Sequence, residues 1–352
     1  MVITFITFYD KRQSNFSAKG TVLAATRVST SIDLDKPGRH VGEIRLRWSD
    51  NSNPLGHHPI PVVSLKSGSG PVALFIGGTH GDEFEGPAAL MRLAQRLDPA
   101  DLAGQVILVP ALNAPAFAEA SRVSPLDGAN LNRAFPGDPN GGPTAMIADF
   151  VETELLPRAD AVVDLHSGGK ASFFQPCTLV THCDDSALYE ANLALARAFG
   201  LPLIWRLGDQ NDDRSVNAAA ERQNVPMIAT ELGGGGGTDP EITGNAETGL
   251  LRMLRNMGIV AGEAEPQHAR IVETASPASS LYATSDGVFD RAAAAGQEAR
   301  PGALAGRLHH VFEPERPSTD VKFRSDGFIL AHTCRGLVRR GELLHLVAQD
   351  VT

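Results

Sequence analysis

The sequence has few cysteines and no excess of basic residues, and both absences narrow the kinds of protein it can encode. Its 352 residues include three cysteines, Cys177, Cys183 and Cys334, whose number and spacing suit neither a disulfide framework nor a cysteine-based metal site. There are 41 Asp and Glu residues against 31 Lys and Arg, for a net charge of −10. Since nucleic-acid binders need a basic surface to displace phosphate counterions, these counts argue against a nucleic-acid partner. We expect a reducing compartment and a small-molecule partner.

Long hydrophobic runs are also absent. No segment is long enough to span a membrane, so no membrane contact is predicted. Residues 2–9 are apolar, but no basic residue precedes them and no small-residue cleavage site follows, so we do not predict a secretory signal. We therefore expect a cytoplasmic protein. Its first twenty or so residues are expected to be a loose extension, or else an artefact of the choice of start codon. The sequence leaves assembly into a homo-oligomer open.

Short apolar runs alternate with helical patterns between residues 71 and 260, which is typical of strands joined by crossover helices. The predicted strands are residues 72–76, 105–110, 161–165 and 226–230, and the predicted helices are residues 86–97, 145–156, 186–199, 216–222 and 246–256. We predict an α/β fold with a mostly parallel central sheet and flanking helices over residues 71–260. Residues 1–70 are expected to be an N-terminal extension with a β-rich lead-in.

The region from residue 261 to 352 has a different residue pattern from that of residues 71–260. Residues 262–273 are mixed and polar and are predicted to be a linker. The pattern at residues 285–289 then recurs at residues 325–329, and each copy is followed by a glycine-led turn. Two similar hairpins closing into a small β-barrel-like domain, resembling the biotinyl/lipoyl type, would explain the repeat. Since no lysine marks a hairpin tip, we expect a structural or oligomerising domain; chance similarity of two Asp-Gly turns is the alternative.

Residues able to bind a metal or move a proton follow three of the predicted strands. His80 and Glu83 come after the first, His166 ends the third and Glu231 ends the fourth. In open α/β sheets, ligands bind beyond the carboxyl ends of the strands, where loops from neighbouring strands meet. The sequence therefore predicts that these four side chains share one crevice.

The spacing of His80 and Glu83 lets both side chains reach one cation, although a His-x-x-Glu pair by itself fits a surface pair or a helix cap equally well. His166 changes that balance, because catalytic zinc is commonly held by two histidines and a glutamate, with one position left for water. We therefore predict one Zn²⁺ per chain. Asp164 is expected to support His166, and ligation by Asp164 itself stays open.

Glu231 is the predicted catalytic base. A carboxylate beside an activated water can take its proton and pass it to the leaving amine. Residues 233–237 are all glycine and would let a substrate approach closely. The alternative is that Glu231 serves as a helix cap or as a buried ion-pair partner.

Four motifs in this order resemble the succinylglutamate desuccinylase/aspartoacylase family, which is related to zinc carboxypeptidases. They are GTHGDE at residues 78–83, NLNRAF at 130–135, DLHSGG at 164–169 and ELG at 231–233. The resemblance covers residues 71–259. It implies that His80, Glu83 and His166 bind zinc and that Glu231 is the base. It also implies that Asn132 and Arg133 grip a substrate carboxylate and that Arg122 polarises the scissile carbonyl.

Within the family, the motifs look most like those of members that deacetylate N-alpha-acetyl-L-2,4-diaminobutyrate in ectoine breakdown. The implied substrate is a small N-acyl amino acid with a free ammonium, for which Asp209, Asp212 and Asp213 are candidate partners, unless they form only a solvated loop. Other N-acyl amino acids, as in aspartoacylase or succinylglutamate desuccinylase, are the alternative. A metallocarboxypeptidase would need an open groove. A catalytically silent binding protein is not expected to keep the complete His/Glu/His set together with Glu231.

Overall fold

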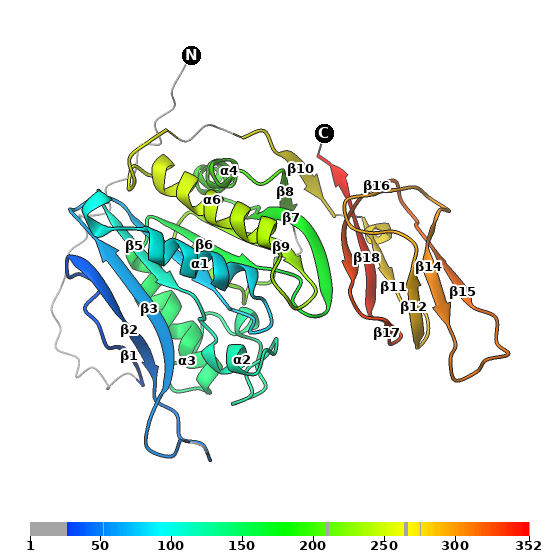
Figure 1. The fold of residues 1–352 in the computed structure, drawn as a ribbon, viewed down its shortest axis with the longest axis horizontal. Helices are drawn as coiled ribbons and strands as arrows, with labels where there is room; N and C mark the ends of the chain where they lie inside the picture. Colours follow the sequence, from blue (N-terminus) through cyan, green and yellow to red (C-terminus); the bar gives the residue numbers. More distant parts are fainter. Residues whose placement is uncertain (1–26, 52, 209–210, 264–266, 275, 352) are drawn as a thin grey trace.

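The computed structural model describes residues 27–51, 53–208, 211–263, 267–274 and 276–351. Helices and the longest strands form one body, and a smaller unit made of strands extends from it (Figure 1). The expectation of a loose extension over the first twenty residues, and the candidate Asp209, lie outside the described residues.

Four strands form the centre of the large sheet. They are β5 (Gln105–Val109), β4 (Val72–Gly77), β6 (Ala161–His166) and β9 (Met227–Gly234), each parallel to the next. All four were predicted, and each contains a run of apolar residues because both faces of the sheet are covered there. In β4, Ala73 and Phe75 enter the core on one face while Leu74 and Ile76 enter the core on the other, as the alternation of strand side chains requires.

Antiparallel strands flank this centre. On one side lie β1 (Val28–Thr30), β2 (Gly38–Leu46) and β3 (His58–Lys66), of which β3 pairs with β5. On the other side β7 (Ser172–Thr181) runs antiparallel to β9 and parallel to β8 (Leu203–Leu207). The predicted α/β fold with flanking helices is confirmed, but the sheet is mixed: the parallel order holds for the four central strands, while β1, β2, β3 and β7 add antiparallel pairs.

Helices cover both faces of the sheet (Figure 1). One face is packed by α1 (Glu85–Arg96), α4 (Ser186–Phe199) and α6 (Pro240–Asn256), and the other by α3 (Pro143–Phe150) and α5 (Val216–Arg222). The predicted bounds of α4 and α5 are confirmed. The predicted start of α6 is six residues too late, because the first turns of this helix are polar. Asp239 caps these turns by accepting the backbone N–H groups of Glu241 and Ile242.

Shorter helical segments complete the body. They are η1 (Pro99–Asp101), α2 (Ala114–Ala118), η2 (Leu131–Arg133), η3 (Val151–Leu155) and η4 (Leu156–Arg158), with η5 (Pro277–Ser279) in the C-terminal region. The single helix predicted over residues 145–156 is α3 followed by η3 and η4. The helix type changes there from α to π in η3 and then to 3₁₀ in η4. An apolar pattern with helical period does not reveal such changes.

The C-terminal strands are divided between two sheets. β10 (Arg270–Glu273), β11 (Ser280–Tyr282), β13 (Glu298–Ala299), β16 (Gly327–Thr333) and β18 (Leu343–Asp350) extend the large sheet. β15 (Thr319–Lys322), β14 (Leu304–His309), β12 (Gly287–Arg291) and β17 (Leu337–Val338) form a separate four-stranded sheet. The predicted linker is wrong over its last residues, because β10 pairs with β8 and fully buries Val272.

The sequence repeat corresponds to two related hairpins. Its copies begin β12 at Gly287 and β16 at Gly327, and these strands pair with β14 and β18 respectively. The short strand that follows each copy pairs with the first strand of the other copy. Thus β13 pairs with β16, and β17 pairs with β12. Lys322 lies within β15 opposite Leu304, away from a hairpin tip.

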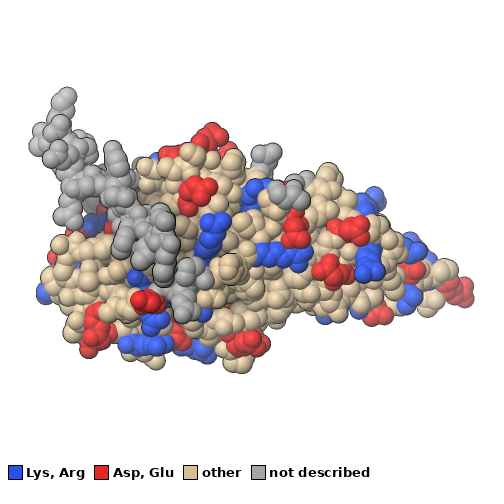
Figure 2. Space-filling model, turned by 90° about the horizontal axis from the view of Figure 1, so that it is seen from above, with Lys and Arg blue, Asp and Glu red and all other residues tan. Residues whose placement is uncertain are grey.

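The C-terminal strands join the larger body through hydrogen bonds and a shared core. β10 joins β8 to β18, and β16 pairs with β7. Trp205 and Ala229 from the body pack in one cluster with Leu330 and Leu346. On the face seen in Figure 2, acidic and basic side chains are interspersed without a broad basic area. Among the described residues, no helix has the length and apolar character needed to cross a membrane.

Candidate metal and catalytic site

The predicted site residues meet at the carboxyl ends of three neighbouring parallel strands. In the register of the sheet, His166 at the end of β6 is paired with Glu231 in β9, and Gly77 at the end of β4 is paired with Leu165. The chain leaves β4 through Gly78 and Thr79 and places His80 and Glu83 above the end of β6. The predicted common crevice is therefore present.

His80, Glu83 and His166 form a compact buried group. Glu83 Oε1 lies 2.8 Å from His80 Nδ1, and its Oε2 lies 2.9 Å from His166 Nδ1. One ligand atom from each residue lies within 4.8 Å of the others, so the three could hold one metal ion. Burial opposes ionisation of the carboxyl, but the two imidazoles outweigh it and hold the pKa of Glu83 well below its usual range. Two imidazoles and a charged carboxylate fit a divalent cation such as zinc.

Asp164 supports His166 from the opposite side of the ring. Its Oδ2 lies 2.7 Å from His166 Nε2, and its Oδ1 accepts a hydrogen bond of 2.8 Å from the Thr79 hydroxyl. The nitrogen that faces Glu83 is Nδ1, so Asp164 orients the ring from the other nitrogen and is not part of the candidate ligand set. Burial lowers the pKa of His166, but Asp164 and Glu83 together raise it well above its usual value.

The ring of His80 is held in the same manner by an amide. Its Nε2 lies 3.2 Å from Asn130 Oδ1, which also accepts the backbone N–H of Asn132 at 2.9 Å. Asn130 therefore fixes both the ring of His80 and the start of η2, the turn that carries Asn132 and Arg133.

Glu231 has an enclosed oxygen without a partner. Among the described residues, nothing donates a hydrogen bond to its Oε2. Burial, reinforced by the nearby charge of Glu83, raises the pKa of Glu231 to about 8. An acid poised near neutral pH beside a candidate metal group is suited to proton transfer.

A cavity of about 180 Å³ opens onto this group. It is lined by the predicted metal ligands, the predicted base and the residues predicted to bind the substrate carboxylate and carbonyl, namely His80, Glu83, Arg122, Asn132, Arg133, His166 and Glu231. Arg122 reaches in at the margin, with 53% of its side chain exposed and its Nη1 3.5 Å from Glu83 Oε1. The cavity joins the candidate metal group to a set of positively charged and amide donors.

The amide of Asn132 has a defined orientation. Its Oδ1 accepts the backbone N–H of Val216 at 2.9 Å, while its Nδ2 lies 3.5 Å from His166 Nε2. The donor end of the amide therefore lies beside the candidate metal group. Arg133 follows in the chain and also lines the cavity, where a guanidinium can bind a carboxylate with two parallel hydrogen bonds.

The apolar wall of the cavity was not predicted. It is formed by Phe174, Leu179, Trp205, Leu207 and Ala229, all from β7, β8 and β9. Alternation in β8 offered a signal, since Leu203, Trp205 and Leu207 share one face. β7 and β8 lie beyond β9 in the sheet, and the sequence does not reveal this strand order. The sequence therefore did not indicate that this face borders the site.

Three polar residues of the wall, Asn211, Ser215 and Asn217, were missed as well. Ser215 caps α5 through the backbone N–H of Ala218, and a serine before a helical pattern is a recognisable cap. Of the three candidate aspartates, the structure brings Asp212 into the cavity wall and leaves Asp213 exposed at the surface.

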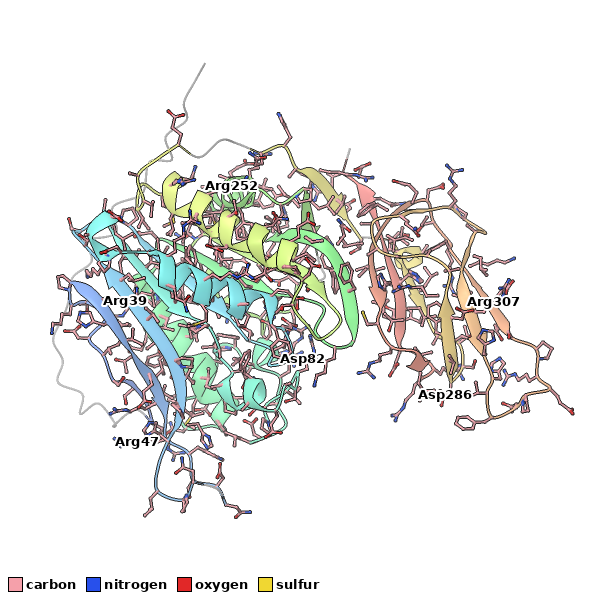
Figure 3. All side chains as sticks on the ribbon, in the orientation of Figure 1. Arg39, Arg47, Asp82, Arg252, Asp286 and Arg307 are labelled. Atoms are coloured by element: carbon pink, nitrogen blue, oxygen red, sulfur yellow. The ribbon has the colours of Figure 1, made fainter. Side chains whose placement is uncertain are left out.

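A glycine brings two loops of the site together. Gly169 has a φ of +54°, and a Cβ atom there would come within 2.6 Å of Asp82 Oδ2. The next residue, Lys170, donates its backbone N–H to the same oxygen at 3.0 Å. Asp82 lies where the body faces the C-terminal sheets (Figure 3). It therefore ties the loop after His166 to the loop that carries His80 and Glu83.

Comparisons with known proteins agree with this architecture. The family model "Succinylglutamate desuccinylase/Aspartoacylase catalytic domain" matches residues 69–257. The N-alpha-acetyl-L-2,4-diaminobutyric acid deacetylase of Halomonas elongata is 35% identical over 326 residues, covering 92% of this chain and 95% of that protein.

Solved structures are also similar. The product-bound ectoine utilization protein EutE (DoeB) from Ruegeria pomeroyi matches with a TM-score of 0.89 at 34% identity, over 92% of this chain and 99% of that one. A succinylglutamate desuccinylase/aspartoacylase from Rhodobacter sphaeroides gives a TM-score of 0.87 at 34% identity, over 92% of this chain and 100% of that one.

The matched residues 69–257 agree with the region over which the sequence motifs resemble the family, residues 71–259. They contain the four residues that meet at the strand ends, and the likeness to whole relatives continues through the C-terminal strands. The chain belongs to the succinylglutamate desuccinylase/aspartoacylase family.

Proposed function

We propose that this enzyme hydrolyses the amide bond of N-alpha-acetyl-L-2,4-diaminobutyrate, releasing acetate and diaminobutyrate in the breakdown of ectoine. Family membership makes the chain a deacylase, and its substrate is the part that we infer. The names of the Halomonas and Ruegeria relatives support this choice. The observation that carries the proposal is one small cavity that joins a His/Glu/His group, the Asn132–Arg133 pair and Glu231, whose Oε2 has no hydrogen-bond partner among the described residues.

We infer that His80, Glu83 and His166 hold one Zn²⁺ per chain. Their nitrogen and oxygen donors are those that zinc prefers, and the ring nitrogens that do not face Glu83 are already engaged by Asn130 and Asp164. A zinc ion held there would acidify water and draw electron density from the scissile carbonyl.

Glu231 is proposed to move the proton. Its enclosed oxygen, free of protein donors among the described residues, can accept a proton from the attacking water as the new C–O bond forms. The same proton then passes to the amide nitrogen as the C–N bond breaks, so that the amine leaves neutral. Arg122, beside Glu83 at the margin of the cavity, is proposed to stabilise the negative charge that develops on the carbonyl oxygen.

Asn132 and Arg133 are proposed to bind the α-carboxylate. The amide presents its Nδ2 beside His166, and the guanidinium adds a permanent positive charge. Two fixed contacts on the carboxylate would set the scissile bond against the candidate metal group, which contributes to rate and not only to affinity.

The size of the cavity favours a small acyl amino acid over a peptide. About 180 Å³ suits a molecule of roughly ten heavy atoms, whereas a carboxypeptidase needs an open groove for a chain. We propose that residues 71–260 carry the chemistry, that residues 1–70 support the edge of the sheet, and that residues 261–352 have a structural or oligomerising role.

Chromatographic detection of the freed amino acid tests the substrate, because it registers acetyl, succinyl and peptide substrates alike. The panel should contain N-alpha-acetyl-L-2,4-diaminobutyrate, N-acetylaspartate, N-succinylglutamate and short peptides, with metal content measured on the same preparation. We expect the highest kcat/KM for the acetylated diamino acid and about one zinc per chain. A preference for N-acetylaspartate or N-succinylglutamate would reassign the substrate, and preferential peptide cleavage would replace the deacylase proposal altogether.

A further inference from the structure

The carboxylate of Asp212 lies between two arginines in the wall of the cavity. Its Oδ2 is 3.0 Å from Arg133 Nε and accepts Arg214 Nη2 at 2.9 Å. Its Oδ1 accepts both the Nε and the backbone N–H of Arg214, each at 2.9 Å. Three N–H groups of Arg214 therefore donate to one carboxylate, and the guanidinium of Arg133 forms an ion pair with it.

This arrangement argues against the simplest role for Asp212, which is to meet the ammonium of the substrate. A carboxylate has about four lone-pair positions, and here Arg214 donates three hydrogen bonds to them while the guanidinium of Arg133 lies 3.0 Å from Oδ2. A substrate ammonium would have to displace one of the two guanidinium groups. The positive charge on the pair of arginines also exceeds the negative charge of the carboxylate, so the array as a whole attracts anions.

The contacts of Arg133 explain what Asp212 does instead. The Nε of Arg133 faces Asp212, and its Nη1 donates to the backbone carbonyl of Asn132 at 2.6 Å. The hydrogen bond at Nη1 and the ion pair at Nε together restrict the position and orientation of the planar guanidinium. Among the described residues Nη2 has no hydrogen-bond partner, so it is left for a ligand in the cavity that Arg133 lines.

Two further contacts join the segments that carry these residues. Asn132 Oδ1 accepts the backbone N–H of Val216 at 2.9 Å, and the backbone N–H of Phe135 is 3.2 Å from the carbonyl oxygen of Arg214. The turn that carries Asn132 and Arg133 is thus joined to residues 212–216 at three points. The site for the carboxylate is therefore built from two segments about eighty residues apart in the sequence.

We propose that Asp212 is a positioning residue for carboxylate recognition: it holds the guanidinium of Arg133 in the orientation that receives the α-carboxylate of the substrate. The inference rests on the proposed function, because it assumes that the cavity takes an amino-acid carboxylate. Arg133 is 42% exposed and Arg214 is 62% exposed, so the array adds little to stability, as is usual for surface ion pairs. The effect of Asp212 is on the direction in which the N–H donors of Arg133 point.

The test compares a substrate with its carboxamide. Wild type should prefer N-alpha-acetyl-diaminobutyrate to the analogue in which the carboxylate is an amide. In Asp212→Ala we expect KM for the carboxylate substrate to rise about tenfold and the preference to shrink by a similar factor, with kcat less affected, because a misdirected guanidinium loses bidentate contact. Asp212→Asn, which keeps one acceptor, should fall between. Asp213→Ala, a change at the exposed neighbouring aspartate, should behave as wild type.

A second variant separates positioning from folding. Lysine has no Nε–H to place against Asp212, so Asp212→Ala should add little in an Arg133→Lys background. Equal losses for both substrates, or full additivity with Arg133→Lys, would show that Asp212 acts only on the structure of the loop and would overturn the proposal.

Calorimetry keeps this inference separate from the proposed function. Binding of diaminobutyrate and of its carboxamide can be measured for wild type and for Asp212→Ala without turnover. If no substrate of the panel is hydrolysed, the proposed function fails, while a carboxylate preference in binding that Asp212→Ala reduces still supports the positioning role. If wild type binds both compounds equally, or the variant keeps the full preference, the positioning role is wrong.

Discussion

The two ring nitrogens of His166 have different tasks. Nδ1 faces Glu83 and the candidate metal position, whereas Nε2 is held by Asp164, which is itself held by Thr79. His80 repeats the arrangement with Asn130 in place of a carboxylate. Support of this kind keeps each ring in one orientation, so that a metal meets preformed donors.

Removal of one imidazole tests the candidate ligand set. His166→Ala should lose bound metal, because a site with only two protein ligands left binds zinc far more weakly. The fold should persist, since the contacts of Glu83 with His80, the backbone N–H of Ser167 and Arg122 remain. Elemental analysis with circular dichroism measures both properties. His268→Ala, a change at an exposed histidine, is the control, and a full equivalent of zinc in His166→Ala would refute the assignment.

Glu231→Gln separates proton transfer from metal binding. Glutamine keeps the size of the side chain but cannot act as a base. Turnover should therefore fall by about 10²–10⁴-fold, mainly in kcat, while metal content stays near that of wild type. Steady-state kinetics with metal analysis decides the outcome. Retained turnover would remove Glu231 from the mechanism, and loss of metal would make it a ligand.

The pKa of Glu231 also predicts a pH dependence of stability in the metal-free protein. Burial raises this pKa from 4.5 to about 8, so between these values the folded state keeps a proton that the unfolded state has lost. The contribution of Glu231 to the free energy of unfolding should be full below pH 4.5 and should fall as the pH rises towards 8. Urea denaturation of chelated protein at pH 5, 7 and 9 measures the effect.

Glu231→Gln is the matched comparison, because it removes this titration. The variant should gain stability relative to wild type as the pH rises from 5 to 9. A constant difference between the two proteins across this range would mean that Glu231 has an ordinary pKa.

The sequence predicted those site residues that follow apolar strands or lie in family motifs. His80, Glu83, His166 and Glu231 were expected in one crevice because parallel strands bring their carboxyl ends to one edge, and the register of the sheet bears this out. The partnership of Asp212 with Arg133 could not be predicted. It depends on how the loop before α5 folds over η2, a tertiary contact that leaves no periodic signal in either segment.

At the level of the elements, the close approach of α1 to β6 positions the site. Gly86 lies in the first turn of α1, where a Cβ atom would come within 2.5 Å of Leu165 Cβ and 2.9 Å of its carbonyl oxygen. Leu165 directly precedes His166. The absence of a side chain at Gly86 therefore lets the helix that begins after Glu83 pack against the strand that carries His166.

Gly86→Ala should push α1 away from β6. We expect a loss of about 1–3 kcal/mol in the free energy of unfolding, as for other overpacked cores, together with a lower kcat because Glu83 and His166 are moved apart. Gly244→Ala in α6 is the matched control. A Cβ there meets no atom within 4 Å, so this change should stabilise the protein by up to about 1 kcal/mol. Denaturant titration and steady-state kinetics measure the two effects. Equal stability and equal kcat in the two variants would contradict this prediction.

Helices and strands were predicted correctly where their buried apolar residues recur at one regular spacing. The bounds of α4 and α5 were right because their apolar residues recur at helical spacing between polar caps. β10 was missed, since its four residues contain only Ile271 and Val272 as apolar members. Their burial comes from β8 on one side and β18 on the other, and a local pattern does not contain those partners.

At the scale of the whole molecule, the C-terminal strands are not a separate attachment. β16 pairs with β7, the strand that supplies Phe174 to the cavity wall, and Thr333 and Cys334 bond to the carbonyl oxygen of Ala171. Residues 171–174 directly follow the Gly168–Gly169–Lys170 loop. The position of the C-terminal unit therefore bears on the cavity through β7. The repeat predicted the hairpins of this unit, but no pattern within them indicated which strand they would join.

Continuity of the sheet predicts that the body and the C-terminal unit unfold together. Leu330 is fully buried in the cluster that contains Trp205 and Ala229 from the body, so Leu330→Ala should cost about 2–5 kcal/mol. Because those contacts cross between the two parts, calorimetry should show a single transition that moves to lower temperature as a whole. Leu337→Ala, at a residue that is 62% exposed in the same unit, should leave the transition nearly unchanged. Two transitions, with only the smaller one shifted in Leu330→Ala, would mean that the C-terminal strands fold independently of the body.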